Sequence, residues 1–204
     1  MDSLETEAYR KGYRYIAGID EAGRGPLAGP VVAAAVIFTT LPPPTLGIKD
    51  SKKLTPLKRE ALAREIRLRA YAVGIGVVSN VEIDRLNIHK ATLKAMEKAV
   101  RGLVCADRKP VRPDLLLIDG PFTVDTLDMP QRAVVSGDSL SVSIAAASII
   151  AKTTRDRIMQ TCHNIYPEYN FMKNKGYGTR EHISVLSSIG PSPLHRRSFC
   201  YGKR

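Results

Sequence analysis

Short apolar runs alternate with amphipathic stretches along the whole chain. The run at residues 31–38 has no polar position, which is typical of a strand buried on both faces. Residues 13–20, 71–78, 114–119 and 132–136 are further apolar runs that end near glycine, proline, serine or acidic residues. We therefore expect a strand at each of these five places.

Helical patterns lie between these runs. Residues 55–69 open with a Thr-Pro pair suited to an N-cap and a first turn. Ser79 to Glu82 has the spacing of a capping box, which predicts a turn leading into a helix over about 88–103. A long helix is expected over about 140–165, and a short one after Thr179.

Strands that alternate with helices and share one sheet give an α/β plan. The chain has 204 residues, enough for one core, so we expect a single domain over 1–204 with a helical C-terminal portion from about 160. The proline-rich stretch 41–47 is a loop too short to link domains. Three widely spaced cysteines, no run of membrane-spanning length and no leader-like N-terminus favour a cytoplasmic protein, and monomer is the default expectation.

Net charge points to the class of partner. Lys and Arg number 31 against 20 Asp and Glu, which gives +11. Such an excess favours a polyanion such as a nucleic acid. A solvated basic surface explains the same charge equally well, so charge alone does not identify a function.

Four carboxylates stand beside glycines where apolar runs begin or end: Asp20, Glu21, Asp119 and Asp138. Strand ends collect functional groups in an open α/β sheet, so we expect these four at one edge. Clustered carboxylates repel one another unless protons or cations intervene, and oxygen ligands suit Mg²⁺. Two such ions could activate water and stabilise the leaving oxygen of a phosphodiester. Taken singly, each acid also fits an N-cap, a turn or a solvated strand end.

Basic and glycine-rich segments supply candidates for holding a nucleic-acid strand. Gly23, Arg24 and Gly25 could bring backbone N–H groups and one guanidinium close to a phosphate. The loop at 173–178 combines lysines, glycines and Tyr177, which suits stacking beside a phosphate track. Further phosphate-binding candidates are Ser51, Lys52, Lys53 and Arg197. Each segment also fits a plain turn, a surface loop or a solvated charge run.

Other chemistries lack support in this sequence. The four histidines show no metal-ligand spacing, and neither a nucleophile elbow nor a Walker loop occurs. Acyl transfer and nucleotide hydrolysis are therefore not indicated. A non-catalytic nucleic-acid-binding module and a general DNA nuclease or polynucleotidyl transferase remain as alternatives, because the charge and the acids fit them too.

With these segments assembled, the chain resembles the ribonuclease HII family over nearly its whole length. The matching stretches begin at six places, and their joint order and spacing are specific. They are GIDEAGRGPLAGPVV from Gly18, DSKKL from Asp50, LLIDG from Leu116, GDSLSVSIAAASIIAKTTRDR from Gly137, KGYGT from Lys175 and HRRSF from His195.

The resemblance implies a ribonuclease H-like fold, a mixed five-stranded sheet flanked by helices, with additional C-terminal helices. It implies that Asp20, Glu21, Asp119 and Asp138 bind two Mg²⁺ or Mn²⁺ ions. It also implies a substrate-sensing loop at Gly23, Arg24 and Gly25 and a sugar-stacking Tyr177. The arginine in this loop matches the type 2 pattern better than the type 3 pattern, in which lysine is common.

The same resemblance implies an activity. The expected enzyme is an endonuclease that cleaves RNA in RNA/DNA hybrids and cuts 5′ of single ribonucleotides embedded in duplex DNA. Its products carry 3′-hydroxyl and 5′-phosphate ends. The loop and the tyrosine together would recognise the 2′-hydroxyl, the group that separates RNA from DNA at one position.

Overall fold

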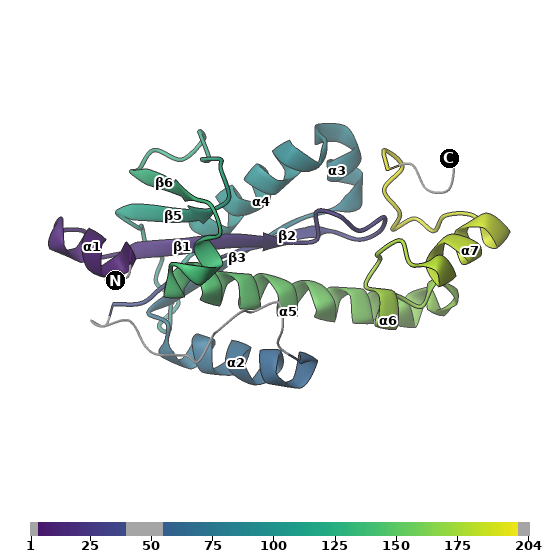
Figure 1. Ribbon diagram of the computed structural model, residues 1–204, viewed down its shortest axis with the longest axis horizontal. Helices are drawn as coiled ribbons and strands as arrows, with labels where there is room; N and C mark the ends of the chain where they lie inside the picture. The colour runs from purple at the N-terminus through teal and green to yellow at the C-terminus, as the bar shows by residue number, and fades with distance from the viewer. Residues whose placement is uncertain (1–3, 40–54, 200–204) are drawn as a thin grey trace.

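Six strands form one mixed sheet with helices on both faces (Figure 1). The computed structural model describes residues 4–39 and 55–199. The sheet order is β4-β3-β2-β1-β5-β6; β1 to β4 are antiparallel neighbours, and β5 and β6 run parallel to β1. The strands are β1 Ile16–Ala22, β2 Val31–Ile37, β3 Ala72–Val78, β4 Val104–Cys105, β5 Leu115–Asp119 and β6 Gln131–Val134.

The five expected strands are confirmed, and β4 is the sixth. It has two residues, too few to show any periodicity in the sequence. Strand β2 is buried at all seven positions, as its apolar run predicted. Its antiparallel pairing with β1 could not be read from periodicity, because direction leaves no mark on the pattern.

The helices predicted over 55–69, over about 140–165 and after Thr179 begin close to those positions. Thr55 caps α2, Ser141 caps α5 and Thr179 caps α7, each accepting a hydrogen bond from a backbone N–H three residues later. The Ser79–Glu82 capping box is present, but it opens a helix, α3, where a turn was expected. The α-helices are α1 Leu4–Arg10, α2 Pro56–Arg69, α3 Asn80–Leu86, α4 Ile88–Arg101, α5 Val142–Ile165, α6 Phe171–Asn174 and α7 Arg180–Ile189.

Two apolar layers hold the sheet between its helices. Helix α4 packs on one face through Ala91, Ala95 and Ala99, which share an apolar cluster with alternate residues of β1 and β2. The other face carries α5 and α2, and Figure 1 shows α5 running along the sheet with α2 beyond it. The alanine-rich stretch 145–151 of α5 lies on this second face.

Two glycines allow the helices to approach the strands this closely. A Cβ on Gly18 of β1 would lie 2.1 Å from the carbonyl carbon of Ser143 in α5. A Cβ on Gly76 of β3 would lie 1.9 Å from the Ala95 oxygen in α4. Any side chain at these positions would push strand and helix apart, so glycine sets both spacings.

The C-terminal helices pack against the end of α5 that lies farthest from α1 (Figure 1). A separate apolar cluster joins them to α5 and to the segment before β2; it consists of Ala28, Met159, Tyr169, Phe171 and Leu186. This packing brings the 175–178 loop to the end of strand β1. Within the described ranges, no helix combines the length and apolar character needed to cross a membrane.

Candidate active site

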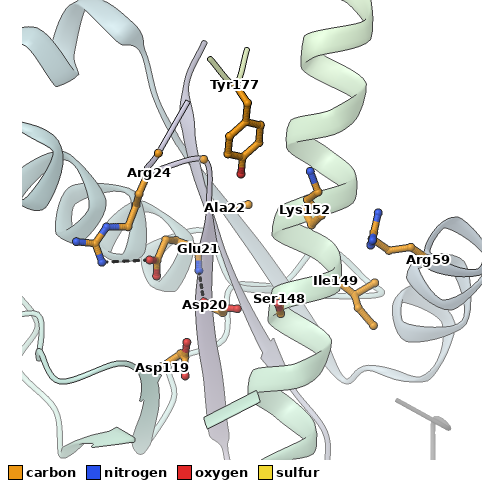
Figure 2. Close-up of a pocket in the computed structure, with 12 residues that line it drawn as sticks. Asp20, Glu21, Ala22, Arg24, Arg59, Asp119, Ser148, Ile149, Lys152 and Tyr177 are labelled. Carbon is orange, nitrogen blue, oxygen red and sulfur yellow. Dashed lines mark hydrogen bonds and ion pairs between the residues drawn. The ribbon is translucent and has the colours of Figure 1, made fainter. Parts of the chain in front are cut away.

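A pocket of about 440 Å³ opens where β1 and β5 end. It collects side chains from both strands, from α2 and α5, and from two loops (Figure 2). The lining residues are Asp20, Glu21, Ala22, Gly23, Arg24, Gly25, Arg59, Asp119, Ser148, Ile149, Lys152 and Tyr177.

Three of the four predicted acids lie together in this pocket: Asp20, Glu21 and Asp119. Because β1 and β5 are parallel neighbours with Ile19 beside Ile118, the next residue of each strand is an aspartate at the same edge. The Glu21 N–H donates to Asp20 Oδ1 at 2.7 Å, and the Gly137 N–H donates to Asp119 Oδ1 at 2.7 Å. Backbone amides therefore orient both aspartates.

The carboxylates of the pocket are electrostatically crowded. Asp20 is 7% exposed, and its burial, with the negative charges of Glu21 and Asp119, raises its pKa well above the usual range despite a hydrogen bond from Ser148. Burial also raises the pKa of Glu21, against the attraction of Arg24, whose Nη1 lies 3.4 Å from Glu21 Oε1. A cation placed among these groups would relieve both effects.

Asp138 stands apart from the pocket lining. It lies in the short 3-10 helix Gly137–Ser139, which precedes α5, and is connected to Asp119 through the neighbouring Gly137 N–H. The N-cap of α5 is Ser141, so the alternative reading of Asp138 as that cap is wrong. Across residues 4–39 and 55–199, no three His, Cys, Asp or Glu side chains are grouped as ligands of one metal ion. The four-acid metal site thus stays a prediction.

The predicted sensing elements meet at the other side of the pocket. A Cβ on Gly25 would lie 3.8 Å from Tyr177 Cε1, so the loop and the ring are in direct proximity. The Leu27 N–H donates to the Gly176 carbonyl at 2.8 Å and joins the two loops. Figure 2 shows the Tyr177 ring, 45% exposed, with its hydroxyl directed toward the acidic side of the pocket.

Sequence reasoning missed three polar residues of the pocket. Ser148 and Lys152 lie four residues apart on α5 and so share one face, a spacing that was visible in the sequence. Arg59 enters from α2 and lies 3.9 Å from Asp156, which also pairs with Lys152 at 2.7 Å. Only the packing of α2 against α5 reveals that Arg59 reaches this place.

The remaining predicted substrate contacts lie elsewhere. Ser51, Lys52 and Lys53 fall outside the described residues. Arg197 is exposed and is not among the residues that line the pocket; its backbone N–H donates to Asp84 Oδ2 at 2.9 Å. The preceding Arg196, in contrast, is fully buried.

Comparison with known proteins agrees with this geometry. The profile of the family described as Ribonuclease HII matches residues 17–201. A Ribonuclease HII from Syntrophus aciditrophicus is 55% identical over 202 residues, covering 98% of this chain and 90% of that protein. The crystal structure of ribonuclease H2 from Pyrococcus horikoshii OT3 superimposes with a TM-score of 0.75 at 26% identity, covering 91% of this chain and 93% of that one.

A more distant likeness concerns the fold alone. The structure of Bst-RNase HIII in complex with Mn²⁺ has a TM-score of 0.70 at 20% identity, covering 95% of this chain and 70% of that one. The family profile matches nearly all of the sequence. This match agrees with the mixed sheet, the C-terminal helices and the acidic strand ends of the structure. On these grounds the chain belongs to the ribonuclease HII family.

Proposed function

We propose that this endoribonuclease of the ribonuclease HII family cleaves RNA in RNA/DNA hybrids and cuts on the 5′ side of single ribonucleotides embedded in duplex DNA. The products would carry 3′-hydroxyl and 5′-phosphate ends. One observation carries the proposal: Asp20, Glu21 and Asp119 line the same pocket as the Gly23–Gly25 loop and Tyr177. Groups suited to cutting a phosphodiester and groups suited to reading a sugar therefore lie side by side.

Divalent cations fit the acidic side of this pocket. Its donors are carboxylate oxygens, which Mg²⁺ and Mn²⁺ prefer, and the raised pKa of Asp20 reflects buried negative charge that a cation would offset. We propose that Asp20, Glu21, Asp119 and Asp138 hold two such ions. The solved complex of Bst-RNase HIII with Mn²⁺, which shares the fold, supports this choice. When bound, the ions would activate water and neutralise developing charge on the scissile phosphate.

The remaining pocket residues bind and orient the nucleic acid. Lys152 and Arg59 place positive charge on the α5 and α2 side, which suits backbone phosphates. Tyr177 offers a half-exposed ring for stacking on a sugar or base. Arg24, 45% exposed at its side chain, can exchange its long contact with Glu21 for a phosphate. One chain supplies every one of these groups, which supports a monomeric enzyme.

Incision mapping tests the proposal on a DNA duplex with one ribonucleotide, with Mg²⁺ and Mn²⁺ compared. The decisive variant is Asp119→Asn, because asparagine keeps the Oδ1 that accepts the Gly137 N–H and removes only the charge. We expect incision to fall by about 100-fold or more with folding intact. Asp125→Asn, an exposed acid outside the pocket, is the matched control and should keep wild-type turnover.

Each other result has a definite meaning. Turnover by Asp119→Asn at the wild-type rate would contradict the assignment of the acids. Cleavage of an all-DNA duplex by the wild type would favour a general nuclease, and binding without any metal-dependent product would favour a non-catalytic module. Tyr177→Ala should reduce incision at a single ribonucleotide more than it reduces binding; equal effects would remove the sensing role of the ring.

A further inference from the structure

Two arginines are fully buried beside the pocket without a carboxylate partner among the described residues. Arg155 is 1% exposed and Arg196 is 0% exposed. Their guanidinium groups donate instead to backbone carbonyls, including those of Pro30 and Gly29. Burying a guanidinium is costly, and burial together with the nearby Arg155 charge lowers the pKa of Arg196 to about 9. A buried guanidinium needs hydrogen-bond partners, and both of these bind backbone whose position they then restrict.

Arg196 holds the Gly23–Gly25 loop by its carbonyl groups. Its Nη2 donates to the Gly23 oxygen at 2.6 Å and its Nη1 to the Arg24 oxygen at 2.9 Å. In a trans peptide the N–H points opposite to the C=O. The N–H groups of Arg24 and Gly25 are therefore turned away from Arg196, and these residues line the pocket. Arg196 thus fixes the orientation of two peptide groups in the wall of the pocket.

Arg155 connects the segment that follows the Gly23–Gly25 loop to the loop that carries Tyr177. Its Nη2 and Nε donate to the Ala28 and Pro30 oxygens at 3.1 and 3.0 Å, and its Nη1 donates to the Lys175 oxygen at 3.0 Å. The guanidinium carbon also lies 6.0 Å from the centre of the Tyr177 ring. A Cβ on Gly23 would lie 2.1 Å from Arg155 Nε, so this side chain also packs directly against the sensing loop.

A buried histidine pair holds Tyr177 by its backbone. The Ser192 N–H donates to His195 Nδ1 at 2.9 Å, so a neutral His195 carries its proton on Nε2. That nitrogen lies 3.0 Å from His182 Nε2, which must accept, leaving His182 Nδ1 to donate to the Tyr177 carbonyl at 2.8 Å. The hydrogen-bond geometry alone thus assigns both tautomers.

We propose that the consecutive residues His195 and Arg196 are positioning residues that set the placement of the sensing loop relative to Tyr177. His195 acts through His182 on the tyrosine, and Arg196 acts directly on Gly23 and Arg24. This inference rests on the proposed function, because it assigns the two elements to recognition of one ribonucleotide. A duplex with a single ribonucleotide offers one cleavable position, so it demands this placement more strictly than a long hybrid, which offers many.

The first experiment compares two substitutions of His182. Asparagine can place its amide N–H where Nδ1 stood and keep the bond to the Tyr177 carbonyl, whereas glutamine reaches toward His195 and loses that bond. Glutamine is the larger side chain and fills the site better. If His182 only fills space, His182→Gln should therefore keep the higher kcat of the two variants. Positioning predicts the reverse order for kcat on the single-ribonucleotide duplex, with His182→Asn about tenfold faster. Glutamine equal to or faster than asparagine would overturn the proposal.

The second experiment uses Arg196→Lys, which keeps the charge but loses the fork of donors. We expect kcat/KM on the single-ribonucleotide duplex to fall about tenfold more than on a long RNA/DNA hybrid. Arg112→Lys is the matched control, because Arg112 is exposed and donates to the Asp128 carbonyl, and neither residue lines the pocket. Equal losses on the two substrates would overturn the role of Arg196. If Arg196→Lys does not fold, the histidine comparison still decides whether the histidine pair positions Tyr177.

These outcomes separate the inference from the proposed function. If the wild-type enzyme does not incise the single-ribonucleotide duplex, the proposed function fails whatever the variants do. If it does incise and all His182 and Arg196 variants keep the wild-type ratio between the two substrates, the proposed function stands and the positioning role is refuted.

Discussion

Replacing Glu5 with alanine should destabilise the fold, because Glu5 binds the start of a helix that lies 136 residues later in the sequence. Glu5 lies on α1 and is 2% exposed. Its Oε1 accepts from the Ser141 hydroxyl at 2.6 Å and from the Ser143 N–H at 2.9 Å, at the N-terminus of α5. The carboxylate therefore satisfies a helix end that would otherwise be buried without a partner, and that helix carries Ser148 and Lys152 into the pocket.

The size of the loss follows from these contacts. A hydrogen bond to a charged group contributes about 1.5–3 kcal/mol, and a carboxylate at a helix N-terminus adds about 0.3–1 kcal/mol. Glu5 Oε2 is buried without a partner, which offsets part of the gain. We expect Glu5→Ala to lower the free energy of unfolding by about 3 kcal/mol, and the melting temperature by about 6–12 °C.

Urea unfolding followed by circular dichroism at pH 7 measures the effect. Glu7→Ala is the matched control on the same helix: the Glu7 side chain is 44% exposed and pairs with Lys11 and Arg132 at the surface. Such exposed pairs contribute about 1 kcal/mol or less. If the two variants lose the same stability, the capping of α5 by Glu5 is refuted.

Two further predictions concern packing and pH. Gly18→Ala should lower the free energy of unfolding by about 1–3 kcal/mol or more, because a methyl group would overpack the contact between β1 and α5. It should also slow incision, because moving β1 away from α5 moves Asp20 away from Ser148. Wild-type stability in urea would show that the close approach is unimportant. Burial, together with the neighbouring His182 imidazole, lowers the pKa of His195 from 6.5 to about 4, so between these pH values the unfolded chain binds a proton that the folded chain excludes. Stability from this group is complete above pH 6.5 and declines as pH falls toward 4, with a slope of at most about 1.4 kcal/mol per pH unit. A His195→Gln variant should lack that part of the slope, and an unchanged pH profile in the variant would contradict the assignment.

Local signals in the sequence were sufficient for most elements of the fold. The caps at Thr55 and Thr179 and the capping box at Ser79 act within one helical turn, so their positions were predictable. Helix α1 and strand β4 were not, since seven and two residues are too short to show a period. Their stability comes from contacts with distant segments, as the bonds from Glu5 to Ser141 and Ser143 illustrate.

The candidate site likewise contains residues that local sequence patterns reveal and residues whose roles depend on distant contacts. Asp20, Glu21 and Asp119 could be found because acids after apolar strands are a local pattern, and parallel strand ends meet at one edge. The roles of Arg155 and Arg196 could not be found. Arg196 adjoins Arg197, a candidate phosphate contact, and Arg155 lies within the long predicted helix, yet both are buried and donate to carbonyls from other parts of the chain.

The sequence by itself predicted the candidate acids and where most helices and strands lie, because those patterns depend on neighbours within a few positions. Only the tertiary structure decided which charges face the substrate and which hold the backbone. Arg196 and Arg197 are adjacent and chemically identical, yet one is buried at 0% exposure and the other is exposed. Their difference arises from the direction in which the chain turns after Leu194, and that direction is set by contacts with residues about 170 positions earlier.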